Sequence, residues 1–358
     1  MSLRFFDGRS APAACLPWPD IYFTDRYGAA LEISEDAGWE VATWQTPQDG
    51  PILLPYLKRP VDPELCDALG EGPLVDLVGP YGYAGAWAAE STSADAWRAF
   101  RQAFRAAARE RGYVAEFLRL TALVPGAEAL ASADPGVEIE RLSETFRVDL
   151  AGGEDVYWTR AEGRHRTSTR KARKVGLRAE VTDLEPGDMA PGSPFRTLYE
   201  DTMRRVEAKP YYLFADAYYE RLEALADRTW LGRVLDADDD VVAAALFFRS
   251  GKLLHYHLAG SRRQAARDGA NNLLLDAVVR RGIAEGAGGF HLGGGLREGD
   301  ALHKFKRSLG GEALPFRVAR SVLDPDRYHR LTALHAERTD RTVADLEATG
   351  WFPAYRAG

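Results

Sequence analysis

The first half of the chain alternates between short apolar runs and one long amphipathic segment. Apolar runs at residues 39–44 and 52–57 lie between turn-forming stretches, and they predict strands of a mixed sheet. A helix is predicted next, with Thr92 and Asp95 as a capping pair and Gly112 as its end. Its apolar side holds Trp97, Phe100, Phe104 and Ala108. The strand-like run 113–120 (YVAEFLRL) follows directly.

A small and polar segment at residues 126–140 separates this strand from the alternating run 144–150, in which Phe146, Val148 and Leu150 share one face. We therefore place a domain boundary here. The predicted domains are residues 1–140 and residues 141–358, and the second carries the chemically distinctive segments.

The second half predicts a β-meander that leads into a helix. A helix at 195–206 precedes three strands at 230–236, 241–248 and 252–260, with a turn at Ser250 and Gly251. The run 271–286 has helical spacing and ends at Gly286, and a short strand (289–294) and a final helix (300–309) follow. This order predicts an α+β fold with mixed sheets flanked by helices, rather than a parallel doubly wound fold. No short fixed repeat is visible, although diverged duplicates stay possible.

Composition limits the class of protein. The 358 residues, 46% hydrophobic and 28% charged, are typical of a globular chain with two domains. A net charge of -7 argues against a general nucleic-acid coat protein, so any polyanion must meet a local basic patch. Cys15 and Cys66 are too few for a disulfide framework or a cysteine zinc site, which favours a cytoplasmic setting. No signal peptide or membrane-spanning stretch is indicated, so we expect no membrane insertion.

Residues 159–181 (TRAEGRHRTSTRKARKVGLRAEV) form a dense basic run in this acidic chain. Helical spacing places Arg166, Arg170, Arg173 and Lys174 along one side. Such a face attracts the phosphates of a tRNA backbone or a nucleotide diphosphate. A solvated helix face that only confers solubility is the alternative. Aromatic residues do not interleave with the run, so base stacking is not indicated.

A glycine-rich strand end precedes a lysine-bearing helix in residues 288–311 (GGFHLGGGLREGDALHKFKRSLGG). No GK[ST] follows the glycines and no GxGxxG is present, so neither a Walker loop nor a dinucleotide fingerprint is indicated. A fixed lysine beside them can stabilise the negative charge that develops when an ester carbonyl is attacked. A tight turn and an exposed lysine are the simpler interpretations.

These segments together resemble the carboxy-terminal half of FemABX-type aminoacyl transferases, which belong to the GNAT-type acyltransferase superfamily. The resemblance rests on YHLAGS, NNLLLDAVVRRGIAEG, FHLGGG and ALHKFKRSLGG, and on RTSTRKARKVGL and LYEDTMRRVEAKPYYLF. It covers most of residues 140–315, whereas the first half adds only GPYGYAG. It implies two tandem GNAT-like domains, no metal and no bound cofactor, with aminoacyl-tRNA as co-substrate.

The resemblance also assigns roles to individual residues. Lys306 matches the lysine of the family's Phe-Lys motif and is the expected charge-stabilising residue, with Phe305 as the wall beside it. The expected substrate-binding residues are Arg164, Arg166, Arg170, Lys174, Tyr211, Tyr212, Tyr256 and Gly294. Ordinary aromatic packing is the alternative for the two adjacent tyrosines.

Two departures bear on the substrate. No stretch has the length or heptad pattern of the coiled-coil arm found in many peptidoglycan-building members. The pyrophosphate loop of acetyl-CoA enzymes is also altered, because Ala266 stands where that loop has arginine or glutamine. This weakens acetyl-CoA as the donor without excluding it.

Other polar residues have weaker claims. His255 and His257 project to one face of a strand, as two metal ligands would, but no partner stands at a supporting spacing. Asp201 or Glu207 can serve as a base for an amine, although ion pairing on a helix explains both. His291 is more typical of packing than of catalysis, and no Ser-His-Asp order or nucleophile elbow predicts a covalent acyl-enzyme.

The sequence therefore predicts an enzyme that transfers an acyl group, in particular an aminoacyl group carried by tRNA, to an amine of a peptidoglycan precursor or a peptide-like small molecule. Two alternatives stay open: an acyl-CoA-dependent N-acetyltransferase, and a non-catalytic binding protein of the same fold.

Overall fold

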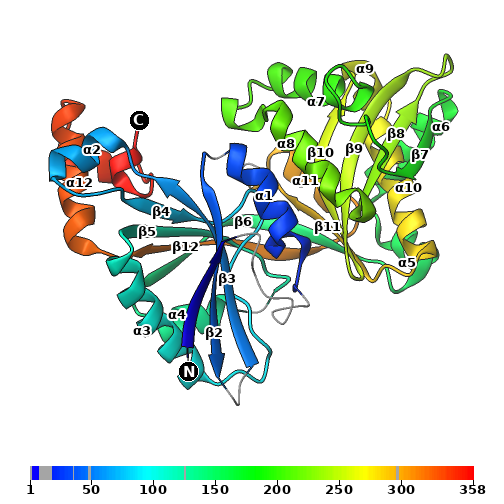
Figure 1. Cartoon of the computed structure of the whole chain (residues 1–358). Coiled ribbons are helices and arrows are strands. Elements are labelled where there is room, and N and C mark those ends of the chain that lie inside the picture. The colour runs from blue at the N-terminus through cyan, green and yellow to red at the C-terminus, as the bar shows by residue number, and fades with distance from the viewer. Residues whose placement is uncertain (1, 8–17, 35, 47–49, 125, 296–297) are drawn as a thin grey trace. The chain divides into compact units, whose positions relative to one another are not determined.

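The chain divides into two compact units (Figure 1). The computed structural model describes all residues except 1, 8–17, 35, 47–49, 125 and 296–297. The first unit comprises Met1–Leu142 and Arg317–Gly358, and the second comprises Ser143–Phe316. The break after residue 142 lies close to the predicted one after residue 140. The end of the chain differs, because the last segment packs with the first unit and not with the second.

The first unit is built on a mixed sheet in the order β1-β2-β3-β4-β5-β12. Its strands are β1 (Ser2–Asp7), β2 (Gly38–Thr46), β3 (Gly50–Pro60), β4 (Val75–Val78), β5 (Tyr113–Leu120) and the second part of β12 (Glu312–Val322). Its helices are α1 (Asp25–Ser34), α2 (Pro63–Leu69), α3 (Ala94–Glu110), α4 (Ala127–Ala133), α12 (Pro325–Arg338) and α13 (Val343–Ala348). The strands predicted at 39–44, 52–57 and 113–120 are confirmed. The helix predicted at 300–309 is not the last, because α12 and α13 follow it.

Helix α3 supplies the core of this unit. All four apolar residues predicted for its inner side are buried, together with side chains of β2, β3 and β5. The cap differs from the prediction, since Ser93 and not Thr92 accepts the hydrogen bond from the Ala96 amide, at 3.2 Å. The segment 126–140, expected to be a polar linker, instead contains α4 and the start of β6 (Val137–Asp149).

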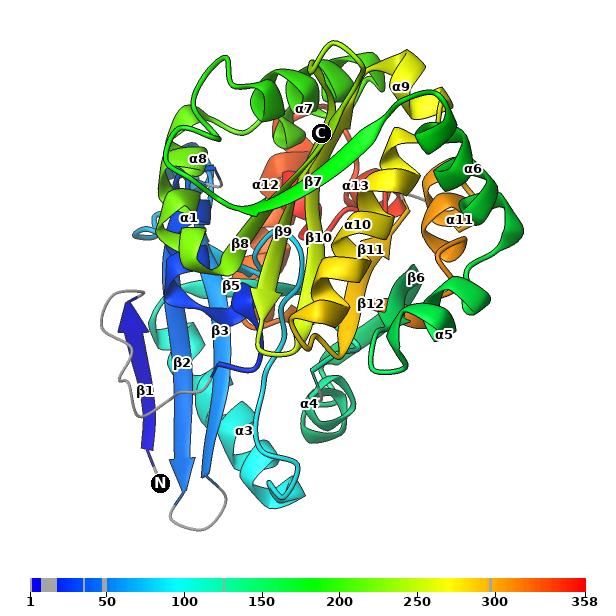
Figure 2. The same ribbon diagram turned by 90° about the vertical axis from the view of Figure 1, so that its right-hand side faces the viewer.

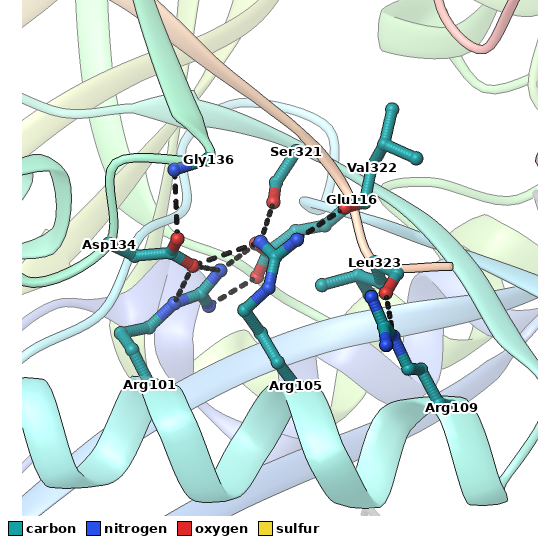
Figure 3. Close-up of polar contacts among 9 residues, drawn as sticks. All are labelled: Arg101, Arg105, Arg109, Glu116, Asp134, Gly136, Ser321, Val322 and Leu323. Atoms are coloured by element: carbon teal, nitrogen blue, oxygen red, sulfur yellow. Dashed lines mark hydrogen bonds and ion pairs between the residues drawn. The ribbon is translucent and has the colours of Figure 1, made fainter. Parts of the chain in front are cut away.

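Two arginines spaced four residues apart on α3 attach β12 and the residue after it to the first unit (Figure 3). Arg105 donates to the Ser321 hydroxyl (2.9 Å) and the Val322 carbonyl (2.7 Å), and Arg109 donates to the Leu323 carbonyl (2.9 Å). These bonds, with the antiparallel pairing of β12 and β5, explain why the end of the chain belongs to this unit.

The second unit repeats the same arrangement (Figure 2). Its sheet has the order β7-β8-β9-β10-β11-β6, with strands β7 (Arg178–Asp183), β8 (Thr229–Leu235), β9 (Val241–Ser250), β10 (Leu253–Ser261), β11 (Gly289–Gly294) and the second part of β6. Its helices are α5 (Gly153–Arg160), α6 (Gly163–Lys174), α7 (Pro194–Arg205), α8 (Asp216–Leu222), α9 (Arg263–Arg267), α10 (Ala270–Ala284) and α11 (Ala301–Arg307). The predicted meander is β8-β9-β10, and α10 is the predicted helix after it.

The two units are structural duplicates, a point that the sequence left open. In each, four antiparallel strands lead through a helix, α3 or α10, to a fifth strand that is parallel to the fourth. A sixth strand, β12 or β6, then pairs antiparallel with the fifth. This order confirms the α+β class with two tandem GNAT-like units. Within the described residues of the second unit the longest helix, α10, has 15 residues and is too short for a coiled-coil arm.

Candidate active site

The candidate site begins in the second unit, where the pairing between strands β10 and β11 ends. Their parallel pairing runs from Leu253 and Gly289 to His255 and His291. Beyond it the register of β10 shifts after Tyr256, while β11 shifts after His291 and reaches Gly293 at a φ of +67°. Only glycine adopts this backbone without strain. The parallel ladder therefore ends just before Tyr256 on β10 and Gly294 on β11.

Helix α11 places Lys306 at this point. Asp300 caps the helix by accepting from the His303 amide at 2.6 Å. The Lys306 side chain is buried, with its residue 8% exposed, and its Nζ donates to the Gly294 carbonyl at 2.8 Å. Nζ also lies 5.5 Å from the centroid of the Tyr256 ring. The structure thus brings together three of the predicted site residues.

Burial changes the acid–base chemistry of this lysine. It lowers the pKa of Lys306 from 10.5 to about 7, and nearby Asp300 opposes the shift. The cause is the loss of hydration of the buried ammonium. About half of the Lys306 side chains therefore carry a charge near pH 7, and the charge is lost as the pH rises further. Burial also raises the pKa of Tyr256, so this hydroxyl stays neutral.

The predicted aromatic residues other than Tyr256 lie in other surroundings. Phe305 is half-buried and packs against the apolar core of the second unit. Tyr211 and Tyr212 form a short helical turn between α7 and α8 and contact each other at 5.6 Å between ring centroids. Tyr211 also contacts Phe214, and the Tyr212 carbonyl accepts from Tyr199 at 2.8 Å. They belong to an aromatic group of their own.

The basic run spans the end of α5, the whole of α6 and the start of β7, and two of its predicted phosphate contacts have other partners. Arg166 donates to the Trp158 carbonyl (3.2 Å) and the Ala161 carbonyl, and so caps the end of α5. Arg164 pairs with Glu162 at 2.8 Å and donates to the Lys304 carbonyl.

Other cationic side chains, near the end of α6, are exposed to solvent. Arg170 and Lys174 are exposed, and Arg170 lies over the Trp158 ring at 5.7 Å. Lys171 pairs with Asp268 at 2.9 Å, while its Nζ donates to a carbonyl of α9, a helix that adds exposed Arg263 and Arg267. Sequence reasoning missed these two arginines because it treated that segment only as an altered pyrophosphate loop.

Helix α6 covers the start of α10. A Cβ built on Gly269 would lie 2.3 Å from the Ser168 carbonyl oxygen, so this glycine permits direct backbone contact between the two helices. His165 accepts from Asn272 at 2.9 Å through Nδ1 and bonds to Tyr157 at 2.8 Å through Nε2. Burial lowers the pKa of His165 to about 4, which keeps the ring neutral. The N-terminus of α10 is therefore covered by another helix.

The remaining candidates serve packing or ion pairing. Within the described residues, no group of three or more His, Cys, Asp or Glu is placed to hold a metal ion. His257 bonds to Tyr218 at 2.9 Å, and burial lowers its pKa to about 3. Asp201 pairs with Arg204 at 3.1 Å on the surface of α7. Cys66 is a buried free thiol, and Cys15 lies outside the described residues.

One polar pair near Lys306 was missed. His303 is 5% exposed, and its Nε2 lies 3.3 Å from Oε2 of Glu144 on β6. Its ring meets Phe146 edge to face at 4.9 Å. The sequence offered one signal for this pair, a histidine three positions before Lys306. It offered none for the partner, because Glu144 lies 159 positions before His303.

No helix among the described residues has the length and apolar character needed to cross a membrane.

Comparisons with known proteins agree with this arrangement. The acetyltransferase (GNAT) domain family matches residues 160–307, which contain α6, α10 and Lys306. The crystal structure of FemX superposes with a TM-score of 0.67 at 12% identity, over 92% of this chain and 99% of FemX.

Two further structures share the fold. A tandem GNAT protein from the clavulanic acid biosynthesis pathway has a TM-score of 0.50 at 11% identity, over 90% of this chain and 99% of its own. The C-terminal domain of a putative lysylphosphatidylglycerol synthetase from Agrobacterium fabrum has a TM-score of 0.52 at 16% identity, over 82% and 87%. A search of the curated proteins finds no match. The chain thus has the tandem GNAT fold seen in FemX and in the tandem GNAT protein, and its residues 160–307 match the acetyltransferase (GNAT) domain family.

Proposed function

We propose that this protein is an N-acyltransferase that moves an aminoacyl group from tRNA to the amine of a peptidoglycan precursor or a peptide-like small molecule. The observation that carries the proposal is the buried Lys306, held by the Gly294 carbonyl where β10 and β11 part. A short helix gains nothing for stability by burying an ammonium, because desolvation of the charge is costly. A perturbed lysine of this kind is typical of a functional site.

Lys306 serves to stabilise charge in this reaction. The acceptor amine attacks the carbonyl of the aminoacyl ester, and the resulting oxyanion takes a hydrogen bond from Nζ. Such a preorganised donor in a site of low dielectric commonly contributes about 3–4 kcal/mol to lowering the barrier. The ester is already activated, so positioning and this charge account for much of the rate, and no covalent enzyme intermediate is needed.

Two observations favour tRNA over coenzyme A as the carrier. The exposed cations of α6 and α9, Arg170, Lys174, Arg263 and Arg267, form a basic surface of the kind that binds a phosphate backbone. The covered N-terminus of α10 leaves its amides less open to a pyrophosphate, for which helix N-termini are otherwise suited. The resemblance of the sequence to FemABX-type aminoacyl transferases implies the same donor.

A transfer assay with two donors tests the proposal. Purified protein is given a mixed pool of radiolabelled aminoacyl-tRNAs and a panel of amine acceptors, with and without ribonuclease, and labelled acetyl-CoA in parallel. We expect label to reach an acceptor from tRNA and to lose that transfer after ribonuclease treatment. Transfer from acetyl-CoA alone would contradict the tRNA proposal and identify the protein as an acyl-CoA-dependent acetyltransferase.

A further inference from the structure

Helix α11 buries two polar side chains on the same side. His303 and Lys306 are three residues apart and therefore neighbours on the helix surface, and both are more than nine-tenths buried. Their neighbours Lys304 and Arg307 are exposed. The helix thus presents one imidazole and one amine together at the glycine-rich end of β11.

Glu144 fixes the orientation and tautomer of this imidazole. It lies on β6 beside Thr145, which pairs with Gly294, so the strand that holds Glu144 also lines the end of β11. A carboxylate can only accept a hydrogen bond, and it faces Nε2 of His303. The neutral ring must then carry its proton on Nε2, and Nδ1 is left with a lone pair.

The Nδ1 atom is buried and has no hydrogen-bond partner among the described residues. An unsatisfied buried polar atom costs about 1–3 kcal/mol. Among the described residues, Glu144 from β6 contacts the ring, and the carboxylate of Asp300, the N-cap of α11, accepts from the His303 backbone amide. Lys306 lies three residues further along the same helix. His303 Nδ1 is thus a basic nitrogen that receives no hydrogen bond from the described residues. It lies about one helical turn from Lys306, where it can accept a proton from a substrate.

We propose that His303, oriented by Glu144, is the proton acceptor for the amine in the transfer reaction. The inference rests on the proposed function in that it assumes an amine acceptor. The acceptor ammonium gives one proton to Nδ1, and the free amine then forms the C–N bond. The ester C–O bond breaks, the second nitrogen proton goes to the leaving oxygen, and the imidazolium releases its proton to solvent. Ester and ammonium give amide, alcohol and one proton.

Glu144 makes this step possible beside a lysine. The imidazolium that forms would repel the Lys306 ammonium, and the carboxylate offsets that repulsion. Glu144 is also partly accessible, with 22% of its side chain exposed, so the pair is in contact with solvent for the return of the proton. The roles of the two side chains of α11 are thus separate: His303 removes the proton and Lys306 stabilises the oxyanion.

The first test compares pH profiles of His303→Asn, Glu144→Gln and the exposed control Lys304→Ala. Asparagine keeps a polar atom near the position of Nδ1 but cannot take a proton. With acceptor saturating, we expect kcat of His303→Asn to fall about 100-fold at pH 6, the lower end of the usual contribution of a general base. The loss should shrink about tenfold for each pH unit as free amine becomes available.

Glu144→Gln should show an intermediate loss of the same form, and Lys304→Ala none. An equal loss at every pH would overturn the proposal, because only a structural role predicts it.

The second test does not need activity. Nitrogen-15 NMR of the imidazoles in the wild-type protein, with the His303 signals assigned by their absence in His303→Asn, reports which nitrogen carries the proton. We expect the Nε2–H tautomer for His303. An Nδ1–H tautomer would overturn the inference whether or not transfer occurs. Absence of transfer from every donor, with the Nε2–H tautomer present, would instead contradict the proposed function and, with it, the role of His303 in transfer.

Discussion

The buried arginine of the first unit gives the sharpest prediction about stability. Arg101 is 1% exposed and donates to both oxygens of Glu116, at 3.2 and 2.8 Å, and to Asp134 at 3.2 Å (Figure 3). Arg101→Met keeps most of the aliphatic volume but removes these hydrogen bonds. Asp134 retains Arg105 and the Gly136 amide, at 3.1 and 2.9 Å, so the main loss falls on Glu116. Breaking one side of a buried ion pair costs about 3–5 kcal/mol, a large share of the roughly 5–15 kcal/mol that stabilises a domain.

The assay is urea unfolding followed by tryptophan fluorescence and circular dichroism. We expect Arg101→Met to lower the free energy of unfolding by about 3–5 kcal/mol. The matched control is Arg98→Met on the same helix. Its pair with Asp95 is exposed, with side-chain exposures of 57% and 87%, and exposed pairs of this kind contribute under about 0.5 kcal/mol. Equal effects of the two variants would refute the reasoning, because it attributes the large loss to the burial of the Arg101 ion pairs.

The same variant predicts a pH dependence. Burial by itself raises the pKa of Asp134, but Arg101, the Gly136 amide and Arg105 outweigh it and hold that pKa below its ordinary value. The lowered pKa stabilises the wild-type fold above the unfolded value of about 4, and this contribution is lost as the pH falls through the folded value. In Arg101→Met the buried carboxylates are relieved by protonation. The difference in unfolding free energy between variant and wild type should therefore shrink from pH 7 to pH 4. A constant difference would contradict the role of Arg101 in holding the pKa of Asp134 low.

Three further predictions concern the second unit. Gly269→Val should destabilise the protein by at least about 2 kcal/mol in thermal unfolding, because φ is +93° there and the new Cβ meets the α6 backbone. The control Gly163→Ala, whose new Cβ has nothing within 4 Å, should be neutral or slightly stabilising. Equal effects of the two variants would contradict the contact between Gly269 and α6. The double variant Arg170→Ala, Lys174→Ala should lower tRNA affinity and reduce the slope of log affinity against log salt by about 2, and an unchanged slope would exclude the α6 surface. If the ammonium of Lys306 is required, kcat should fall as the pH rises through about 7, whereas a role as neutral base predicts a rise.

Much of the fold followed from local pattern. The amphipathic face of α3, the meander β8-β9-β10 and helix α10 each have a periodicity that one element alone determines. The path of β12 was not predictable in this way. It depends on pairing with β5 and on Arg105 and Arg109, whose partners lie more than 200 residues away. Side chains that bond across such distances carry no local signal.

The candidate site was predicted only in part, for a related reason. The nomination of Lys306 rested on the resemblance of its motif, and the structure places it beside Gly294 and Tyr256. Arg166 was chosen by helical spacing, which gives the side of a helix but not what lies there, and it caps α5 instead. The Glu144–His303 pair needed the folded chain, because β6 and α11 are far apart in sequence and are brought together only when β6 pairs with β11.

The most direct test of the central claim separates turnover from binding in Lys306→Ala, with the exposed neighbour Lys304→Ala as control. Single-turnover transfer gives the chemical step, and titration of labelled aminoacyl-tRNA gives donor affinity. The account predicts that Lys306→Ala loses about 100-fold or more in the chemical step, as expected for removal of one oxyanion donor, while donor affinity stays within a few fold. A variant that transfers at the wild-type rate, or one that loses donor affinity with its chemical step intact, would contradict the claim that Lys306 lies at the reaction centre.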